Sequence, residues 1–172
     1  MVVGEGWTGQ DWPSVELDAV RRLRVLAAAG GHAMFAEGTF SASFDEVWSV
    51  ASDLEGELPG FIAGLREFSL GPPVPGSDRR SGVATSVIGH RERFEVVLRP
   101  GWCLMQSKAV VGGMAAVAEE DGVRFALFGG LRLPGVRPVR SAMRRSSALK
   151  GRHLLGKLEA RVAAKAAGAG GS

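Results

Sequence analysis

The chain has 172 residues, with a hydrophobic fraction of 45%, a charged fraction of 23% and a net charge of +3. These values are ordinary for a globular protein and allow one domain with a substantial core. The single cysteine, Cys103, excludes an internal disulfide and a cysteine-based zinc site, and no apolar run approaches the ~18 residues of a membrane-spanning helix.

The beginning of the chain shows no signal-peptide pattern. It contains Glu5 and Asp11 and lacks a basic segment followed by an apolar one. A cytoplasmic location is therefore expected. Cys103 lies in the apolar run Trp102–Met105, which favours a buried, inert thiol over a nucleophile.

The charge is unevenly distributed along the sequence. Between Arg137 and Lys165 there are nine lysines and arginines against one glutamate, so the rest of the chain is net acidic. The basic segment is either a binding surface for an anionic partner or a solvated helix face, and the solvated face is favoured. Nucleic-acid binding is not expected, because the basic residues alternate with apolar positions rather than with stacking aromatics.

The first predicted element is an amphipathic helix at Ser14–Ala29. Ser14 suits the N-cap position after Pro13, and Gly30 and Gly31 suit the C-terminal end. Apolar residues recur at helical spacing, namely Leu17, Val20, Leu23 and Ala27. Residues 1–33 are accordingly interpreted as an N-terminal extension that contains this helix.

A strand and two short helices are predicted next. Met34–Ala42 forms the strand, and Ser43 with Glu46 forms a capping box that begins a helix. In this helix Trp48 is expected to face the core. Pro59 suits the first turn of a second short helix that continues towards Leu65.

Six further strands precede a long C-terminal helix. "GPPVPGSDRRSG" (Gly71–Gly82) is a predicted loop, and period-two alternation and turn signals predict strands at Arg66–Leu70, Val83–Ile88, Arg93–Leu98, Trp102–Ser107, Val110–Glu119 and Val123–Leu131. In the last strand Phe125 is expected to face inward with Val123 and Leu127, whereas Arg124 is expected to face water. The proline-free stretch from Val139 to about Ala167 is long enough to cross a domain, and residues 168–172 are expected to be a disordered tail.

This order predicts an α+β fold with an antiparallel meander of about seven strands. Glycines lie in or beside several strands, where they commonly mark bends that let a sheet curl: Gly89, Gly112, Gly113, Gly129 and Gly130. The long helix is the element that a curled sheet would wrap.

The segment Phe40–Trp48, followed by Asp53 and Pro59, resembles the START/Bet v 1-like (SRPBCC) superfamily, which includes polyketide cyclases and dehydrases. The resemblance covers residues 34–167, and the N-terminal helix lies outside the common pattern. It implies a helix-grip fold with a deep cavity between the concave sheet face and the C-terminal helix. Members of the superfamily hold apolar or amphipathic molecules there, and some catalyse cyclisation or dehydration.

The sequence itself gives partial support for a cavity, and a plain core with loose packing is the alternative. Gly151 and Gly156 interrupt the long helix, at a cost of about 1 kcal/mol each against alanine. They suggest either close packing or space for a guest. The residues expected to line or approach the cavity are Trp48, Phe61, Leu65, Phe94, Met105, Met114, Phe125, Leu127, Met143 and Leu154.

Two residues are candidate polar groups within the cavity. Gln106 ends an apolar strand and faces either inward, where it would orient a ligand, or outward. His153 lies on the long helix beside Leu154, and it is either a general base in the cavity or a surface residue. His90, at a strand end, is expected at the cavity mouth or in a turn. No metal-binding spacing is present, and no cofactor is expected.

Three functions remain open. The first is binding of a small hydrophobic or amphipathic ligand, such as a lipid, isoprenoid or polyketide-like molecule. The second is an enzyme of the polyketide cyclase/dehydrase type, with His153 as the catalytic candidate. The third is a protein-interaction module that acts through the basic C-terminal helix. Oligomeric state and the role of the N-terminal helix are not predicted.

Overall fold

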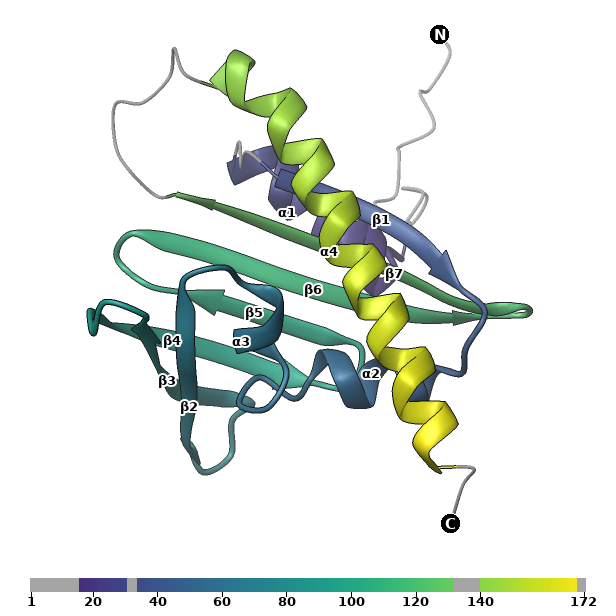
Figure 1. The fold of residues 1–172 in the computed structure, drawn as a ribbon, viewed down its shortest axis with the longest axis horizontal. Helices are drawn as coiled ribbons and strands as arrows, with labels where there is room; N and C mark the ends of the chain where they lie inside the picture. Colours follow the sequence, from purple (N-terminus) through teal and green to yellow (C-terminus); the bar gives the residue numbers. More distant parts are fainter. Residues whose placement is uncertain (1–15, 31–33, 132–139, 170–172) are drawn as a thin grey trace, which may run out of the picture.

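The computed structural model describes residues 16–30, 34–131 and 140–169 of the chain. Seven antiparallel strands form one curved sheet in the order β1-β7-β6-β5-β4-β3-β2, and a long helix, α4 (Arg140–Ala169), crosses its concave side (Figure 1). The predicted α+β helix-grip architecture is confirmed.

Consecutive strands pair as a meander, and β1 joins the far edge by pairing with β7. The strands are β1 (Met34–Phe40), β2 (Leu65–Pro73), β3 (Arg79–Ser86), β4 (Arg91–Arg99), β5 (Trp102–Gln106), β6 (Val110–Glu119) and β7 (Gly122–Leu131). The loop predicted at Gly71–Gly82 is shorter than expected, because β2 and β3 extend into it until Pro73 pairs with Arg80. Proline is tolerated there because β2 is an edge strand.

The two short helices follow β1 as predicted. At the start of α2 (Phe44–Ala51), the Glu46 amide donates to Ser43 Oγ and the Ser43 amide donates to Glu46 Oε2 at 2.8 Å, so the predicted capping box is present. Pro59 occupies the first turn of α3 (Leu58–Phe61). Because this helix is a single turn, its position depends on its packing against β2 and α4.

The N-terminal helix, α1 (Ala19–Gly30), begins five residues later than predicted. Asp18 caps it by accepting a hydrogen bond from the Arg21 amide at 2.8 Å. The expected cap, Ser14, lies outside the described residues. Asp18 suits this position because its carboxylate both accepts from the amide and favours the positive end of the helix dipole.

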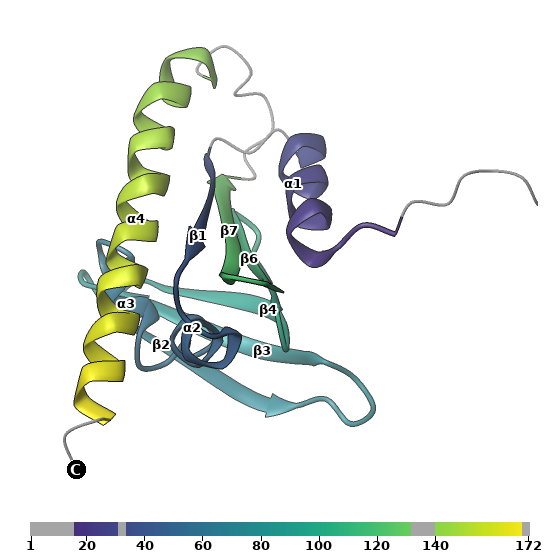
Figure 2. The ribbon, with the colours of Figure 1, turned by 90° about the vertical axis from the view of Figure 1, so that its right-hand side faces the viewer.

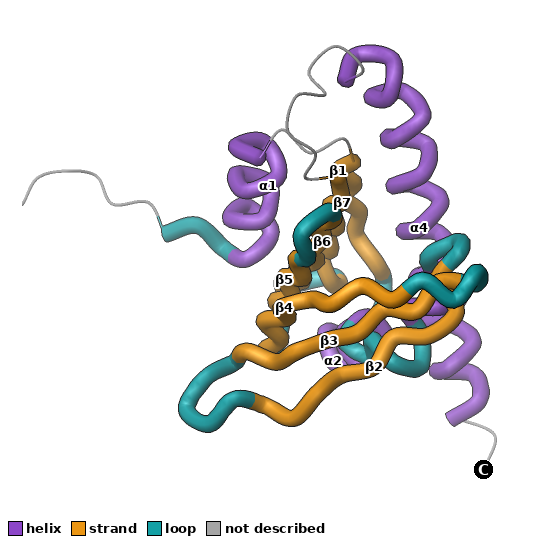
Figure 3. Tube along the Cα trace, turned by 90° about the vertical axis from the view of Figure 1, so that its left-hand side faces the viewer, coloured by secondary structure: helices purple, strands orange, loops and turns teal. Residues whose placement is uncertain are grey.

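Helix α1 lies on the convex face of the sheet, on the side opposite to α4 (Figures 2 and 3). Its apolar face buries Val20 and Leu23 completely against a second hydrophobic cluster that includes Trp102 and Phe128. This placement corrects the expectation that Arg124 faces water. The Arg124 side chain is on the convex face, but it is only 19% exposed and contacts Asp18 at 2.9 Å.

Helix α4 packs on β1 and α2 on the concave side, where the larger hydrophobic cluster lies. It continues to Ala169, so Gly168, which the sequence assigned to a disordered tail, is helical. Residues 170–172 lie outside the described residues.

Candidate ligand-binding cavity

A cavity of about 540 Å³ lies between the concave face of the sheet, α3 and α4. The side chains that line it come from strands β1 to β7 and from the three helices α2, α3 and α4. They are apolar except for Ser86, His90 and Glu92, as far as the structure describes the chain. The cavity therefore has an apolar body with a few polar groups, the usual character of a small-molecule site.

Two glycines help to keep the cavity open. Gly112 on β6 pairs directly with Gly129 on β7, and both line the cavity. A Cβ atom built on Gly112 would meet only the Phe128 carbonyl oxygen, at the ordinary contact distance of 3.5 Å. A side chain at this position would thus extend into empty space. From the sequence, these glycines were interpreted as bends in the sheet, and their place in the cavity wall was not predicted.

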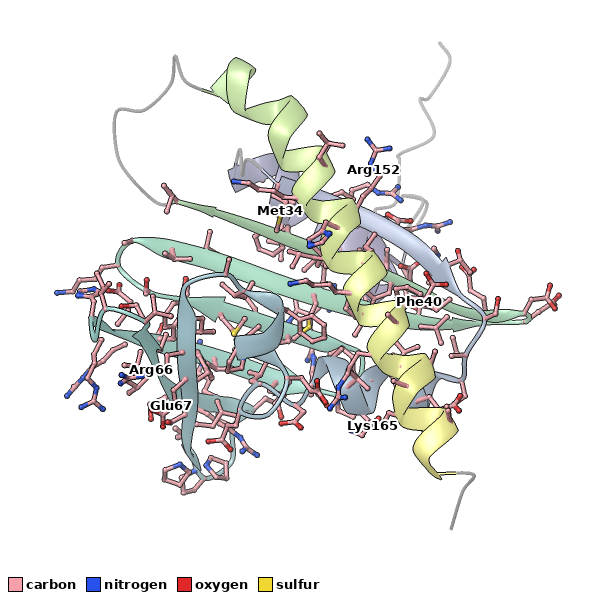
Figure 4. The ribbon with its side chains drawn as sticks, viewed as in Figure 1. Met34, Phe40, Arg66, Glu67, Arg152 and Lys165 are labelled. Carbon is pink, nitrogen blue, oxygen red and sulfur yellow. The ribbon has the colours of Figure 1, made fainter. Side chains whose placement is uncertain are left out.

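The two glycines of α4 lie in different surroundings, because the helix packs closely on β1 at Gly151 but has no neighbour at Gly156. A Cβ atom on Gly151 would lie 2.6 Å from Ala36 Cβ, so this glycine lets the helix approach β1. Met34, at the start of β1, lies beside the same part of the helix (Figure 4). Gly156 differs, because it is exposed and a Cβ atom there would meet nothing within 4 Å. Of the two helix glycines, only Gly151 faces the sheet as expected.

Polar contacts join α4 to the short helix α3. Lys157 Nζ donates to the Gly60 carbonyl oxygen at 3.3 Å, and Arg161 Nε lies 2.8 Å from Glu57 Oε2. Two basic residues of α4 are therefore engaged within the protein. Both interactions hold α3 beside the part of α4 that carries Leu154 and Leu158, which line the cavity.

The structure brings together most of the side chains expected to line a cavity. Those that line it are Phe61, Leu65, Phe94, Met105, Met114, Phe125, Leu127 and Leu154. On the strands, the period-two alternation identifies them, because Phe94 and Met105 share the inner face with the buried residues Val96 and Cys103.

Three expected residues are not in the cavity wall. Trp48 is buried in the adjoining core, where its ring stacks on Phe44 at 6.3 Å between centroids. Gln106 is on the opposite face of β5 from Met105, and its Nε2 donates to Glu95 Oε2 at 2.9 Å, so it faces outward.

His153, the catalytic candidate, is exposed on α4 and does not line the cavity. It follows Arg152 on the solvent side of the helix, whereas the next residue, Leu154, turns inward. The side chain of Met143 lies outside the described residues.

A polar cluster that was not predicted from the sequence lies at one end of the cavity. His90 Nε2 is 3.5 Å from Glu92 Oε2, and the Ser107 hydroxyl, which also reaches the Val110 carbonyl oxygen at 3.4 Å, lies within hydrogen-bonding reach of the same carboxylate. The Ser107 hydrogen bond is the main cause that lowers the pKa of Glu92 below its ordinary value, with a smaller contribution from His90. Glu92 is therefore ionised at neutral pH.

The position of Glu92 was available from the sequence. Phe94 was expected to line the cavity, and strand alternation two residues earlier places Glu92 on the same face. The predicted strand began at Arg93, so Glu92 was not assigned to either face. His90 lies at the cavity mouth, where it was expected, with its side chain 70% exposed.

Other chemistry finds little support among the described residues. Cys103 is fully buried, and desolvation raises the pKa of its thiol to about 12, in agreement with an inert cysteine. Within residues 16–30, 34–131 and 140–169, no cluster of histidine, cysteine and acidic side chains could hold a metal ion. Over the same residues, no helix combines the length and the apolar character needed to span a membrane.

Comparison with solved structures identifies the class of fold. No model of a protein family matches the chain, and no curated protein matches it. Solved structures do match, and they include Bet v 1-type, STAR-related and polyketide-cyclase proteins. The chain therefore has the SRPBCC/Bet v 1-like fold, as the resemblance in its sequence implied.

Three matches illustrate the range of this fold. The di-domain aromatase/cyclase StfQ from the steffimycin biosynthetic pathway aligns with a TM-score of 0.57 and 13% identity over 78% of this chain and 52% of that one, so this chain spans about half of StfQ. A STAR-related lipid transfer protein from Xanthomonas axonopodis aligns with a TM-score of 0.56 and 11% identity over 77% of this chain and 88% of that one. Ara h 8.0201 aligns with a TM-score of 0.51 and 12% identity over 76% of this chain and 97% of that one.

Proposed function

We propose that this protein binds a small hydrophobic or amphipathic ligand, such as a lipid, an isoprenoid or a polyketide-like molecule, in the cavity between the sheet and α4. The observation that carries the proposal is the cavity of about 540 Å³ with its largely apolar wall. Its volume is within the range of about 300–1,000 Å³ typical of small-molecule pockets. Transfer of apolar ligand surface from water would drive binding, at about 25 cal/mol per Å².

The structural matches support this proposal through the fold they share. One match is named as a lipid transfer protein and another as an aromatase/cyclase. The sequence identities of 11–13% make these matches evidence of fold, and the cavity of this chain supplies the argument for binding.

An enzyme of the polyketide cyclase/dehydrase type is the second candidate, and the His90–Glu92 pair is the observation that favours it. An imidazole 3.5 Å from a carboxylate at the end of an apolar cavity is a geometry suited to proton transfer. His153 does not suit this role because it is exposed away from the cavity. His90→Ala separates the candidates: an enzyme loses turnover and keeps its ligand, whereas a binding protein shows no turnover in either form.

Native mass spectrometry of the purified protein tests the binding proposal, followed by organic extraction and identification of any released molecule. The Gly112→Leu variant is the control, because its side chain would occupy the cavity without meeting a close neighbour at Cβ. A defined extra mass on the wild type that is absent from Gly112→Leu supports binding. An apo mass, with no thermal shift across lipids, isoprenoids and aromatic polyketide mimics, would contradict it.

A further inference from the structure

We infer that the polar end of the cavity selects ligands whose head group donates a hydrogen bond, a hydroxyl or an ammonium, and discriminates against carboxylates. The inference rests on the proposed function and specifies the chemistry of the ligand. The group that makes this selection is the carboxylate of Glu92, with His90 and Ser107 beside it.

The polar side chains of the cavity wall are concentrated in one place. Ser86, His90 and Glu92 all belong to the hairpin that joins β3 to β4. The Ser86 hydroxyl accepts a hydrogen bond from the His90 amide at 3.0 Å, which fixes the turn beside Glu92. Strand pairing places Ala84 opposite Glu92, so the directly facing residue on β3 does not compete for this carboxylate.

The cavity has a gradient of exposure that orients an amphipathic guest. At the polar end the side chain of Glu92 is 27% exposed. Elsewhere in the wall, Phe125 on β7 and Leu158 on α4 are buried. An apolar tail would be desolvated against these residues while its head group stays near Glu92 and solvent, which is the arrangement with the smallest cost of burying polar atoms.

The existing partners of Glu92 leave room for a ligand donor. Beside the carboxylate lie His90, whose Nε2 is 3.5 Å from Glu92 Oε2, and Ser107, whose Oγ accepts from the Ala109 amide at 3.2 Å. Two carboxylate oxygens offer about four acceptor positions. A ligand hydroxyl or ammonium can therefore join this set, with an ionised acceptor that strengthens the bond. A ligand carboxylate cannot donate and would meet a like charge.

Three probes with the same chain test the inference: dodecylamine, 1-dodecanol and laurate. Dodecylamine and laurate are titrated below their micelle concentrations and 1-dodecanol below its solubility limit, against protein loaded with the neutral dye N-phenyl-1-naphthylamine, and displacement gives the affinity. The variants are Glu92→Gln and the matched control Glu95→Gln. Glu95 is on the same strand, and its replacement by glutamine changes the charge by the same amount. Its side chain, however, faces outward and accepts a hydrogen bond from Gln106.

The wild type is expected to bind dodecylamine about tenfold more tightly than Glu92→Gln does, with a smaller loss for 1-dodecanol and a gain for laurate. Glu95→Gln is expected to match the wild type for all three probes. Thermal unfolding verifies that each variant is folded, and the gain for laurate is a signal that a misfolded variant would not give.

If the affinity for each probe is the same in the wild type as in Glu92→Gln, the inference is overturned and the proposed function stays in place. Equal effects of Glu92→Gln and Glu95→Gln would also overturn it, because only the net charge would then matter. Displacement by none of the probes, together with no binding of the dye, would contradict the proposed function itself.

Discussion

The two faces of the sheet are made by the same strands but are filled in different ways. On the convex face, α1 packs directly on β6 and β7, and Val20, Leu23 and Ala126 are completely buried. On the concave face, α4 packs on β1 and α2, and a cavity of about 540 Å³ lies between the helix and other strands of the sheet. The concave face therefore combines the larger hydrophobic cluster with space for a ligand, whereas the convex face is filled by α1.

Matched leucine deletions on the two faces give the largest expected effect. Leu23, on the inner side of α1, is 0% exposed, whereas Leu127 borders the cavity and is only partly buried. Leu23→Ala is expected to lower the free energy of unfolding by about 2–5 kcal/mol. Leu127→Ala should cost less than half of that, because its side chain loses fewer contacts. Urea unfolding measures both, and equal losses would show that the concave face is packed as tightly as the convex one.

The next largest effect on stability is expected at the two glycines of α4, of which Gly151 is packed against the sheet and Gly156 is exposed. Gly151→Ala places a methyl group 2.6 Å from Ala36 Cβ and is expected to cost about 1–3 kcal/mol. Gly156→Ala meets nothing within 4 Å and should stabilise the protein by about 0.5–1 kcal/mol through helix propensity. Opposite signs of the change in melting temperature are the expected result. A stabilising Gly151→Ala would show that α4 can move away from β1 without cost.

Acid should weaken the convex face through Asp18, and this is the smallest expected effect. Burial raises the pKa of Asp18, but hydrogen bonds from the Arg21 amide and Arg124 outweigh it, so the pKa lies below its ordinary value. A lowered pKa stabilises the folded state above the ordinary pKa of about 3.9, and this contribution is lost as the pH falls through the folded value.

Asp18→Asn tests this contribution because asparagine keeps the helix cap and removes the charge. The variant should melt below the wild type at pH 7, and the difference should shrink at pH values below about 3.9. Salt should reduce the difference at neutral pH, because Arg124 is not fully buried. A difference that is independent of pH would contradict an electrostatic role for Asp18.

Much of the fold follows from local signals in the sequence. The capping box at Ser43, Pro59 and the alternation in β4 to β7 predicted their elements within a few residues. The predicted start of α1 was wrong because residue type alone suits both Ser14 and Asp18 to an N-cap, whereas in the structure Asp18 accepts from the Arg21 amide and pairs with Arg124.

The cavity was less predictable than the fold, because it depends on where the inner face of the sheet lacks side chains. Gly112 resembles any bend glycine until its pairing with Gly129 is known. His153 and Leu154 are neighbours in sequence, but the rotation of α4 turns only Leu154 inward. Glu92 immediately precedes the predicted strand Arg93–Leu98, and only extending the alternation backward from Phe94 places it on the inner face.

The most direct test of the ligand cavity is a titration of N-phenyl-1-naphthylamine into the wild type, Gly112→Leu and Gly156→Leu. Both variants add the same side chain, but only Gly112 lines the cavity. The dye is expected to fluoresce with the wild type and Gly156→Leu, and to lose at least about tenfold in affinity with a folded Gly112→Leu. Equal binding by all three folded proteins would contradict the account, because the dye would then bind outside the space that Gly112 leaves open.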